Sequence, residues 1–342
     1  MAADSTKGAI SNPKVLARIA LGKKRLQSVL SRHTVAMART LEQKISDAGP
    51  SGQRVDPIYL TKALQELRAE GRVIPKEAER INWYHLAGTD SASIEKRLEE
   101  QVSVYAKATA KQFKNRLGQV LEIAVYRALQ QQSVLEFVGG FSDLDKHGDE
   151  KPYRKDEPPS IVSGKSMGNK RLDFVGWHRE AGMWGIEVKN ARGWFYPDRD
   201  DVRAFLRKCC AVNAVPILIA RRISYVLRSE VFEPCGAIIH QTYNQRYPNS
   251  DEELALLVRD KRLLGFHDVR VGNEPDARLV KFLHVNLPAI LPKARERFDE
   301  HKDLLKGLGD KSLSYVDFHV ELNERLGKYD RVENDNDDGE DD

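Results

Sequence analysis

The chain has 342 residues, of which 41% are apolar and 31% are charged, and this length and composition predict two or three globular domains. No run of eighteen apolar residues occurs and the first residues lack the apolar core of a signal peptide, so neither a membrane span nor export is expected. Three cysteines, Cys209, Cys210 and Cys235, and nine scattered histidines show no metal-binding or disulfide spacing, and a reduced, cytoplasmic chain is the simplest interpretation.

The formal net charge of +4 conceals a strong asymmetry. Residues 333–342 contain seven acidic groups, and removing these seven negative charges leaves +11 on residues 1–332. The tail has no apolar residue to bury, which predicts disorder and a role in solubility, or competition with nucleic acid for a basic surface. The basic remainder suits a protein that binds a polyanion.

The N-terminal part, residues 1–90, predicts a small helical domain. A basic helix is expected over Asn12–Leu30 and an amphipathic helix over Thr34–Ser46, before a turn at 47–52. A third helix is expected from Asp56 to Gly71, because an Asp cap and a proline begin it and a glycine ends it. A short strand at 72–74, a polar stretch and an aromatic strand at Ile81–Leu86 follow.

This order resembles the winged helix-turn-helix family, in which the second helix of the motif enters the DNA major groove and the wing contacts the backbone. The resemblance implies nucleic-acid contacts from Tyr59, Thr61, Lys62, Gln65 and Arg68 on the helix, and from Lys76, Arg80 and Trp83 in the wing. The alternatives are that these residues are ordinary exposed positions, that Trp83 belongs to the core, and that the domain binds protein.

Two further helices are expected next. Residues 91–110 predict a connecting helix, and Phe113–Leu129 has apolar residues at helical spacing. Glu122 lies beside that apolar stripe, where it is either a solvated side chain or part of a site. Residues 139–170 are polar and rich in proline, which predicts a mobile loop able to close over a ligand. A Gly-Lys-Ser sequence within it lacks the earlier glycine and the strand of a phosphate loop.

Asp173, Glu187 and Lys189 are the most informative residues of the chain. Two short strands are expected at 171–177 and 184–190, joined by a turn at 178–183. Side chains alternate along a strand, so Glu187 and Lys189 share one face, and a hairpin would bring Asp173 alongside them. Two carboxylates and an ammonium at one place can bind a divalent metal ion and polarise a phosphate. The alternative is a surface hairpin with a Glu-Lys pair.

The following segments predict a helix at Asp201–Asn213, a buried strand at Val215–Ala220, a short helix at Ser224–Phe232 and a strand at Gly236–Gln241. The continuous apolar runs suit a sheet that is covered on both faces. Beyond residue 250, helices are expected at Asp251–Leu264 and Leu291–Leu308, and Arg278–Leu287 has a strand-like pattern.

Over residues 110–248, the order of elements and the D…ExK residues resemble the PD-(D/E)xK, or restriction-endonuclease-like, nuclease superfamily. Leu172 stands where that family often has proline. The resemblance implies that Asp173, Glu187 and the Val188 carbonyl hold Mg²⁺, for which Mn²⁺ would substitute. It implies Glu122 as a further metal or metal-water ligand, in a Gly118-x-x-x-Glu122 pattern, and Lys189 as the residue that orients or deprotonates the attacking water.

Asn190, Arg192 and Trp194 follow this site in the sequence and are candidates to contact the substrate backbone, or else close the sheet edge. We therefore expect an α/β chain in which an α-rich winged-helix domain (1–90) and a connecting helix (91–110) precede a nuclease core with a mixed sheet flanked by helices (111–250). An extension of the core or a small helical, oligomerisation region (251–332) and the acidic tail (333–342) complete the expected organisation.

The predicted activity is Mg²⁺-dependent hydrolysis of DNA by an endonuclease of defence or repair, with duplex DNA favoured over single strands. A homodimer and a separate ATPase or helicase partner are compatible with this prediction. The alternatives are an RNA nuclease and a DNA-binding regulator or scaffold with an inactive nuclease fold.

Overall fold

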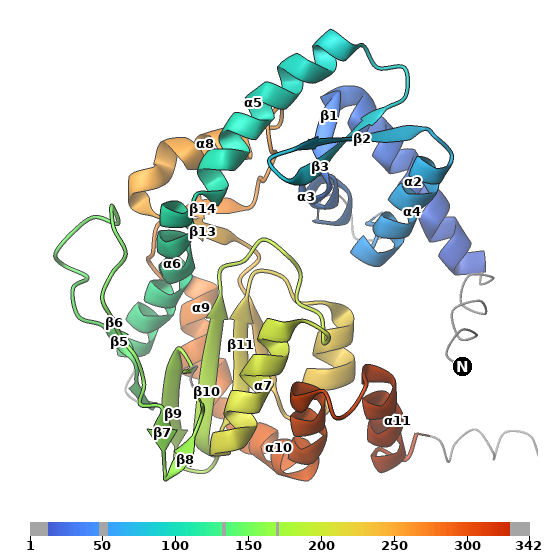
Figure 1. Ribbon diagram of the computed structural model, residues 1–342. Coiled ribbons are helices and arrows are strands. Elements are labelled where there is room, and N and C mark those ends of the chain that lie inside the picture. The colour runs from blue at the N-terminus through green and yellow to red at the C-terminus, as the bar shows by residue number, and fades with distance from the viewer. Residues whose placement is uncertain (1–12, 48–53, 132–134, 169–170, 329–342) are drawn as a thin grey trace, which may run out of the picture. The chain divides into compact units, whose positions relative to one another are not determined.

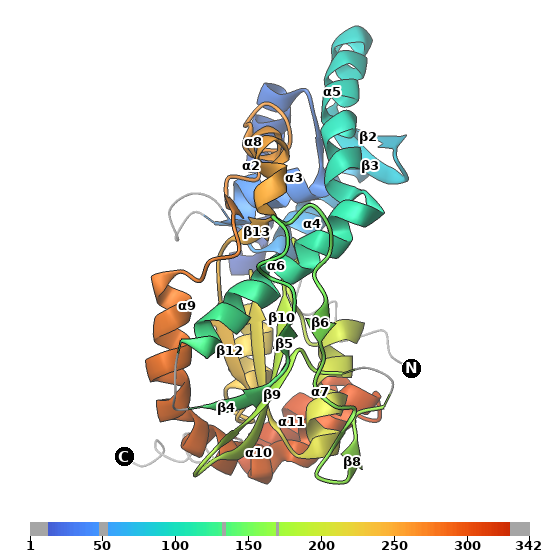
Figure 2. The ribbon, with the colours of Figure 1, turned by 90° about the vertical axis from the view of Figure 1, so that its left-hand side faces the viewer.

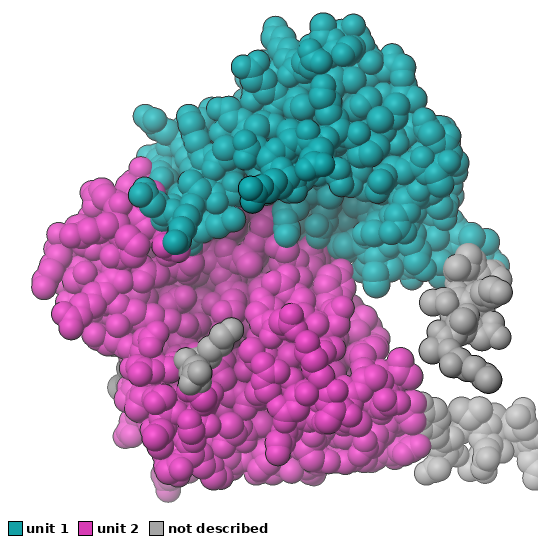
Figure 3. Space-filling view, in the orientation of Figure 1, with its two compact units in different colours: residues 1–114, 251–269 teal, residues 115–250, 270–342 magenta. Residues whose placement is uncertain are grey.

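The computed structural model describes residues 13–47, 54–131, 135–168 and 171–328. Two compact units divide the chain, residues 1–114 with 251–269 and residues 115–250 with 270–342, and Figure 3 colours them separately. This division corrects the expected organisation, because the connecting helix and residues 251–269 both pack in the first unit. The expected C-terminal region 251–332 is therefore not one extension, and only its part beyond residue 269 joins the second unit.

The first unit combines helices with a small antiparallel sheet of order β1-β3-β2 (Figure 1). Its elements are α2 (Pro13–His33), β1 (Val35–Met37), α3 (Ala38–Glu42), the π-helical turn η1 (Gln43–Asp47), α4 (Pro57–Ala69), β2 (Val73–Ala78), β3 (Ile81–Leu86), α5 (Ser91–Thr109) and α8 (Glu252–Arg259). The 3₁₀ turn η4 (Asn249–Asp251) precedes α8, and its first two residues belong to the second unit.

The helix expected at Thr34–Ser46 is wrong in its first part. Thr34 adopts a left-handed φ of 67°, which ends α2, and Val35–Met37 then pairs antiparallel with Trp83–His85 of β3. Tertiary pairing has overridden the helical pattern of the sequence. The helix from Asp56 is confirmed, since the Asp56 side chain accepts a hydrogen bond from the Ile58 N–H at 2.9 Å. Most of the expected turn at 47–52 lies outside the described residues.

The second unit is built around a five-stranded mixed sheet of order β12-β11-β10-β9-β4. Its main elements are α6 (Lys111–Gln130, which begins in the first unit), β4 (Glu136–Val138), β9 (Phe174–His178), β10 (Gly182–Lys189), α7 (Asp200–Val212), β11 (Val215–Ala220), the π-helix η3 (Val226–Phe232) and β12 (Ile238–Gln241). The strands β4, β9 and β10 pair antiparallel, whereas β10, β11 and β12 run parallel.

Helices cover this sheet on both sides. Figure 2 shows α7 on one side and α9 (Ala277–Lys281) on the other. The π-helix η5 (Phe282–Asn286), α10 (Leu287–Asp310) and α11 (Tyr315–Arg325) complete the cover, and their apolar residues join the same core as the strands. Every residue of β11 is buried, as its apolar sequence predicts for a strand covered on both faces. The chain is thus of the mixed α/β class, as expected.

Two local expectations for the second unit need correction. Arg278–Leu287 is helical, because Asp276 caps α9 by accepting from the N–H groups of Arg278 and Leu279, and its apolar residues pack into the core. The edge strand β4 was not anticipated from the sequence.

The segment expected as a mobile loop at 139–170 contains two short strand pairs, β5 (Gly140–Phe141) with β6 (Lys155–Asp156) and β7 (Ile161–Val162) with β8 (Lys165–Ser166). The buried Asp149 anchors the segment by accepting hydrogen bonds from Asn249, Asn273 and Tyr153. A further small pair joins β13 (Gln245–Tyr247) and β14 (Val269–Val271).

Candidate active site

The β9–β10 hairpin brings Asp173 against the Glu187 strand, as the alternation pattern predicts. The Asp173 N–H donates to the Ile186 carbonyl at 3.1 Å, which extends the strand pairing by one residue. The Val188 N–H donates to Asp173 Oδ2 at 2.7 Å, so the backbone of β10 fixes this carboxylate. Asp173 and Glu187 are only 8% and 7% exposed, and a buried carboxylate requires partners.

Lys155 is the partner that connects Asp173 to Glu122. The Nζ of Lys155 lies 2.5 Å from Asp173 Oδ1 and 2.7 Å from Glu122 Oε2. One ammonium group thus links a carboxylate of α6 to a carboxylate at the start of β9. The interpretation of Glu122 as a solvated side chain is wrong, because its side chain is only 15% exposed.

Glu187 is held by two other lysines, one on each oxygen. Lys189 donates to Oε1 at 2.7 Å, and Lys208 of α7 donates to Oε2 at 2.5 Å. Lys208 also donates to the Arg171 carbonyl at 2.8 Å and is nearly fully buried. Three carboxylates and three ammonium groups therefore form one charge-balanced cluster.

The sequence interpretation missed Lys155 and Lys208, for different reasons. Lys208 follows the buried Phe205 by three residues and precedes the buried Val212 by four, so helical spacing alone places it on the buried face of α7. That spacing could have identified it. Lys155 stands among other charged residues in an irregular segment, and no local pattern distinguishes it.

Burial and mutual charge shift the proton affinities in this cluster. Burial, together with the nearby Asp173 carboxylate, raises the pKa of Glu122 to about 7, although Lys155 acts in the opposite direction. For Lys155 and Lys189, burial alone acts to lower the pKa of the ammonium group. The surrounding carboxylates outweigh it, Asp173 foremost for Lys155 and Glu187 for Lys189, and both pKa values are raised.

The carboxylate oxygens of this cluster are of the kind that binds a hard divalent cation, but in this structure they are bonded to lysine ammonium groups. No three carboxylate, imidazole or thiol groups of the described residues lie close enough together to hold a metal ion. Glu122 and Asp173 nevertheless share a single cation, the Lys155 ammonium, at hydrogen-bonding distance. Carboxylate oxygens are the ligands that Mg²⁺ prefers, and Glu122 and Asp173 supply them at the point that the Lys155 ammonium occupies, whereas both oxygens of Glu187 are bonded to lysines.

The residues that follow Lys189 have different surroundings from those expected. Asn190 is buried, and its amide donates to the carbonyls of Leu117 and Arg246 and accepts from the Arg246 N–H. Its expected role as a nucleic-acid contact is therefore wrong, since every polar atom of its side chain is bonded inside the protein. Arg192 and Trp194 are half-buried in the loop after β10.

The first unit carries the other expected contact residues. On α4, Gln65 and Arg68 are exposed and Lys62 is half-buried, whereas Trp83 is fully buried and belongs to the core. Lys76 on β2 is half-buried and forms an ion pair with Glu95 of α5 at 3.4 Å. Arg80 is exposed at the turn between β2 and β3.

That turn is tight. Its two central residues, Glu79 and Arg80, both have left-handed φ values, 52° and 58° respectively. Two successive left-handed residues are typical of a two-residue hairpin turn, and the tip of this hairpin therefore presents Arg80 to solvent.

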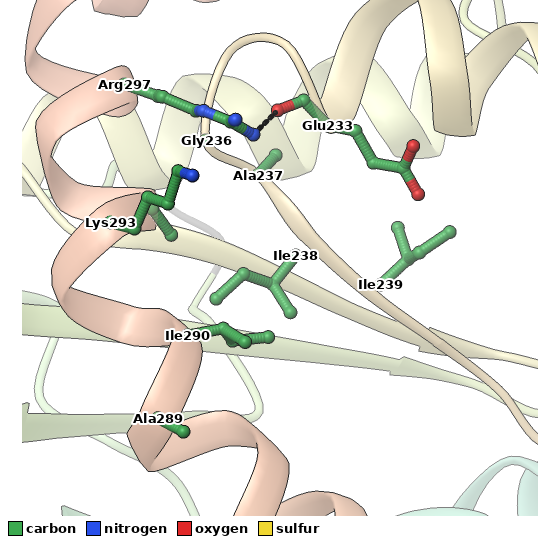
Figure 4. A pocket seen from close by; sticks show the side chains of 10 residues that line it. Glu233, Gly236, Ala237, Ile238, Ile239, Ala289, Ile290, Lys293 and Arg297 are labelled. Atoms are coloured by element: carbon green, nitrogen blue, oxygen red, sulfur yellow. Dashed lines mark hydrogen bonds between the residues drawn. The ribbon is translucent and has the colours of Figure 1, made fainter.

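Cavities lie along strand β12, at the edge of the sheet. One of about 350 Å³ is lined by apolar residues of β12 and α10, among them Ile238 and Ile290, with Lys293 and Arg297 at its rim (Figure 4). Arg297 donates to the Glu233 carbonyl at 3.1 Å across it. A second, of about 550 Å³, shares Ile239 with the first and continues towards Tyr243.

None of the helices in the described part of the chain is long and apolar enough to span a membrane. Comparison of the chain with protein-family models, with curated proteins and with solved structures finds no match.

Proposed function

We propose that the chain is a metal-dependent nuclease with a restriction-endonuclease-like core. One observation carries the proposal: Glu122, Asp173, Glu187 and Lys189, which come from three separate elements, belong to one buried cluster at the end of the β9–β10 hairpin. Burying three carboxylates together is unfavourable, and such clusters are typical of functional sites. The order of elements along the chain and the mixed sheet flanked by helices also support this resemblance.

In this proposal, Asp173, Glu187 and the Val188 carbonyl would hold Mg²⁺ or Mn²⁺, with Glu122 as a further ligand of the ion or its water. The ion would neutralise phosphate charge and make its bound water more acidic. Lys189 is the most exposed of the three lysines, with 30% of its side chain accessible, and would orient the water and contact the phosphate. Lys208, which solvent hardly reaches, would keep Glu187 in place.

We further propose that the first unit is a winged helix that binds duplex DNA. The order of α2, β1, α3, α4, β2 and β3, together with the sheet order β1-β3-β2, supports this assignment. Gln65 and Arg68 of α4 would face the major groove, and Arg80 at the tip of the hairpin would contact the backbone. Lys62 and Lys76 would contribute to the positive potential of this surface.

Cleavage assays on supercoiled plasmid, linear duplex, single-stranded DNA and RNA, with Mg²⁺ or Mn²⁺, test the activity. We expect wild type to cut DNA, and Asp173→Ala and Lys189→Ala to lose at least about 100-fold in rate, because each removes a group that acts on the reacting phosphate. Lys165→Ala, an exposed lysine of β8, is the matched control and should cut like wild type. Equal cutting by Asp173→Ala would refute the site.

Binding assays in EDTA test the first unit separately. We expect Arg68→Ala and Arg80→Ala to weaken duplex binding. Each phosphate contact that is lost should reduce the slope of log affinity against log salt concentration by about one. Arg262→Ala, a highly exposed arginine of the same unit, serves as the control. If Arg68→Ala and Arg80→Ala bind the duplex as tightly as Arg262→Ala and wild type, neither α4 nor the hairpin tip contacts DNA.

A further inference from the structure

Four side chains form a row of alternating aromatic and guanidinium groups in the second unit. Trp194 follows β10, Arg222 follows β11, Tyr243 follows β12, and Arg278 lies in α9. The Cζ of Arg222 lies 6.0 Å from the ring centre of Trp194 and 5.1 Å from that of Tyr243. The Cζ of Arg278 lies 5.8 Å from the centre of the Tyr243 ring on which Arg222 also packs.

Three members of the row, Trp194, Arg222 and Tyr243, follow the carboxyl ends of β10, β11 and β12, and Lys189 is the last residue of β10. In the register of the parallel strands, Lys189 pairs with Ala220, and Ala220 pairs with Gln241. Neighbouring strands are about 4.8 Å apart, so Gln241 lies roughly 10 Å from Lys189 along this edge. The Tyr243 N–H donates to the Arg221 carbonyl at 3.2 Å, which ties the loop after β12 to the end of β11. Ligands of such sheets bind beyond the carboxyl ends of parallel strands.

Tyr243 is both exposed and constrained. Its side chain is 39% exposed, and its φ of 61° is unusual for a residue with a side chain. Non-glycine residues with a left-handed φ are strained and persist only where the surrounding structure holds them. Such residues cluster at functional sites.

The ring of Tyr243 borders the cavity of about 550 Å³, together with Gln241, Arg228 and Arg278. A cavity of this size is within the range of small-ligand sites. Among the described residues that line it, two are arginines and none is a carboxylate, so the cavity favours an anionic ligand.

An exposed aromatic ring between guanidinium groups is suited to a nucleotide. The ring offers a stacking surface to a base, and the arginines contact phosphates or stack in turn. A base inside an intact duplex has both faces covered by its neighbours, so away from a duplex end only an unpaired base can place its face on a protein side chain. The roughly 10 Å between the strand positions of Lys189 and Gln241 corresponds to about three nucleotides of a stacked strand, and Tyr243 follows Gln241 by two residues.

We propose that the Trp194–Arg222–Tyr243–Arg278 row and the adjoining cavity bind unpaired nucleotides a few residues from the phosphate that is cut. The inference rests on the proposed nuclease function and specifies its substrate, a nucleic acid with a single-stranded segment beside the cleavage position. Tyr243 supplies the stacking surface, and Arg278 supplies charge at the exposed end of the row.

The test is equilibrium binding of fluorescently labelled DNA to the full chain in EDTA, where nothing is cut. The three probes have the same duplex sequence. The first is blunt-ended, the second carries a 3′ single-stranded extension of about six nucleotides, and the third carries a 5′ extension of the same length. The variants are Tyr243→Ala, Tyr243→Phe and Arg278→Ala. Trp177→Ala is the matched control, because Trp177 is 37% exposed and pairs with Met183, at the end of the hairpin remote from Asp173.

We expect Tyr243→Ala to weaken binding of at least one extended probe by roughly 5- to 100-fold, and binding of the blunt duplex by less than about twofold. Tyr243→Phe and Trp177→Ala should bind like wild type, and Arg278→Ala should lower the salt dependence on the extended probe by about one charge. Equal affinities of wild type and Tyr243→Ala for every probe, or equal losses on blunt and extended probes, would overturn the inference.

This outcome is separable from the nuclease activity. If Tyr243→Ala loses the extended probes but wild type cuts no nucleic acid with any metal ion, the binding surface stands and the proposed hydrolysis fails. If wild type cuts DNA while Tyr243→Ala binds every probe normally, the nuclease stands and the row is structural.

Discussion

The Lys155 ammonium lies 2.5 Å from Asp173 Oδ1 and 2.7 Å from Glu122 Oε2, so one side chain joins two of the three carboxylates of the proposed metal site. Lys155 belongs to β6, in the segment between β5 and β9, whereas Asp173 is fixed by the backbone of β10. Asp173 is thus held by the backbone, and we expect Lys155 to be the partner that a metal ion would displace. Metal binding and the Lys155 contacts should therefore compete.

Replacing Lys155 by methionine should strengthen divalent metal binding while weakening the metal-free protein. The variant keeps an unbranched side chain one atom shorter but leaves Glu122 and Asp173 without their shared cation, which should cost about 1–3 kcal/mol of unfolding free energy without metal. Metal affinity should rise by about tenfold or more, because no ammonium has to be displaced. Calorimetric titration with Mn²⁺ and urea unfolding in EDTA measure the two effects. Lys165→Met, on the same segment, is the control, and unchanged metal affinity in Lys155→Met would contradict the competition.

Lys189 and Lys208 bond opposite oxygens of Glu187, yet their replacement should have different consequences. Lys208 is nearly fully buried, and removing one partner of such a pair costs about 3–5 kcal/mol. Lys189 is 30% exposed, so Lys189→Met should cost about 1 kcal/mol or less but abolish most cleavage. Chemical unfolding and cleavage rates of the two methionine variants provide the comparison. A large stability loss in Lys189→Met would show that its role is structural.

The raised pKa of Glu122 predicts a pH-dependent stability of the metal-free protein. The folded-state pKa of about 7 exceeds the ordinary value of 4.5, so between these two pH values Glu122 binds a proton more strongly in the folded protein than in the unfolded chain. The contribution of Glu122 is fully present below about pH 4.5 and declines as the pH rises through 7. Glu122→Gln should lack this decline, so the difference in unfolding free energy between the variant and wild type should grow from pH 4.5 to 7.5 in EDTA. A difference that is constant with pH would mean that Glu122 titrates normally.

Much of the fold could be predicted from the sequence where the signals are local. The runs at 215–220 and 81–86 coincide with β11 and β3, and the alternation at Glu187 and Lys189 places both on the side of Lys208. The failures depend on contacts that are distant in the sequence. Residues 35–37 form a strand only because β3 is available to pair with them. Lys155 reaches the site only because β6 pairs with β5 and returns the segment to α6.

The buried Asn190 provides a test of how rigidly the end of β10 must be held. Its amide bonds the carbonyls of Leu117 in α6 and Arg246 in β13, and also the Arg246 N–H, so one side chain links three segments around the site. Asn190→Ala would leave these backbone groups without partners and should cost about 3 kcal/mol of stability. Because Lys189 directly precedes Asn190, cleavage should fall about tenfold even at temperatures where the variant is fully folded. Asn244→Ala, a nearby half-buried asparagine, is the control. If Asn190→Ala has the same unfolding free energy and cleavage rate as wild type, the amide network does not position Lys189.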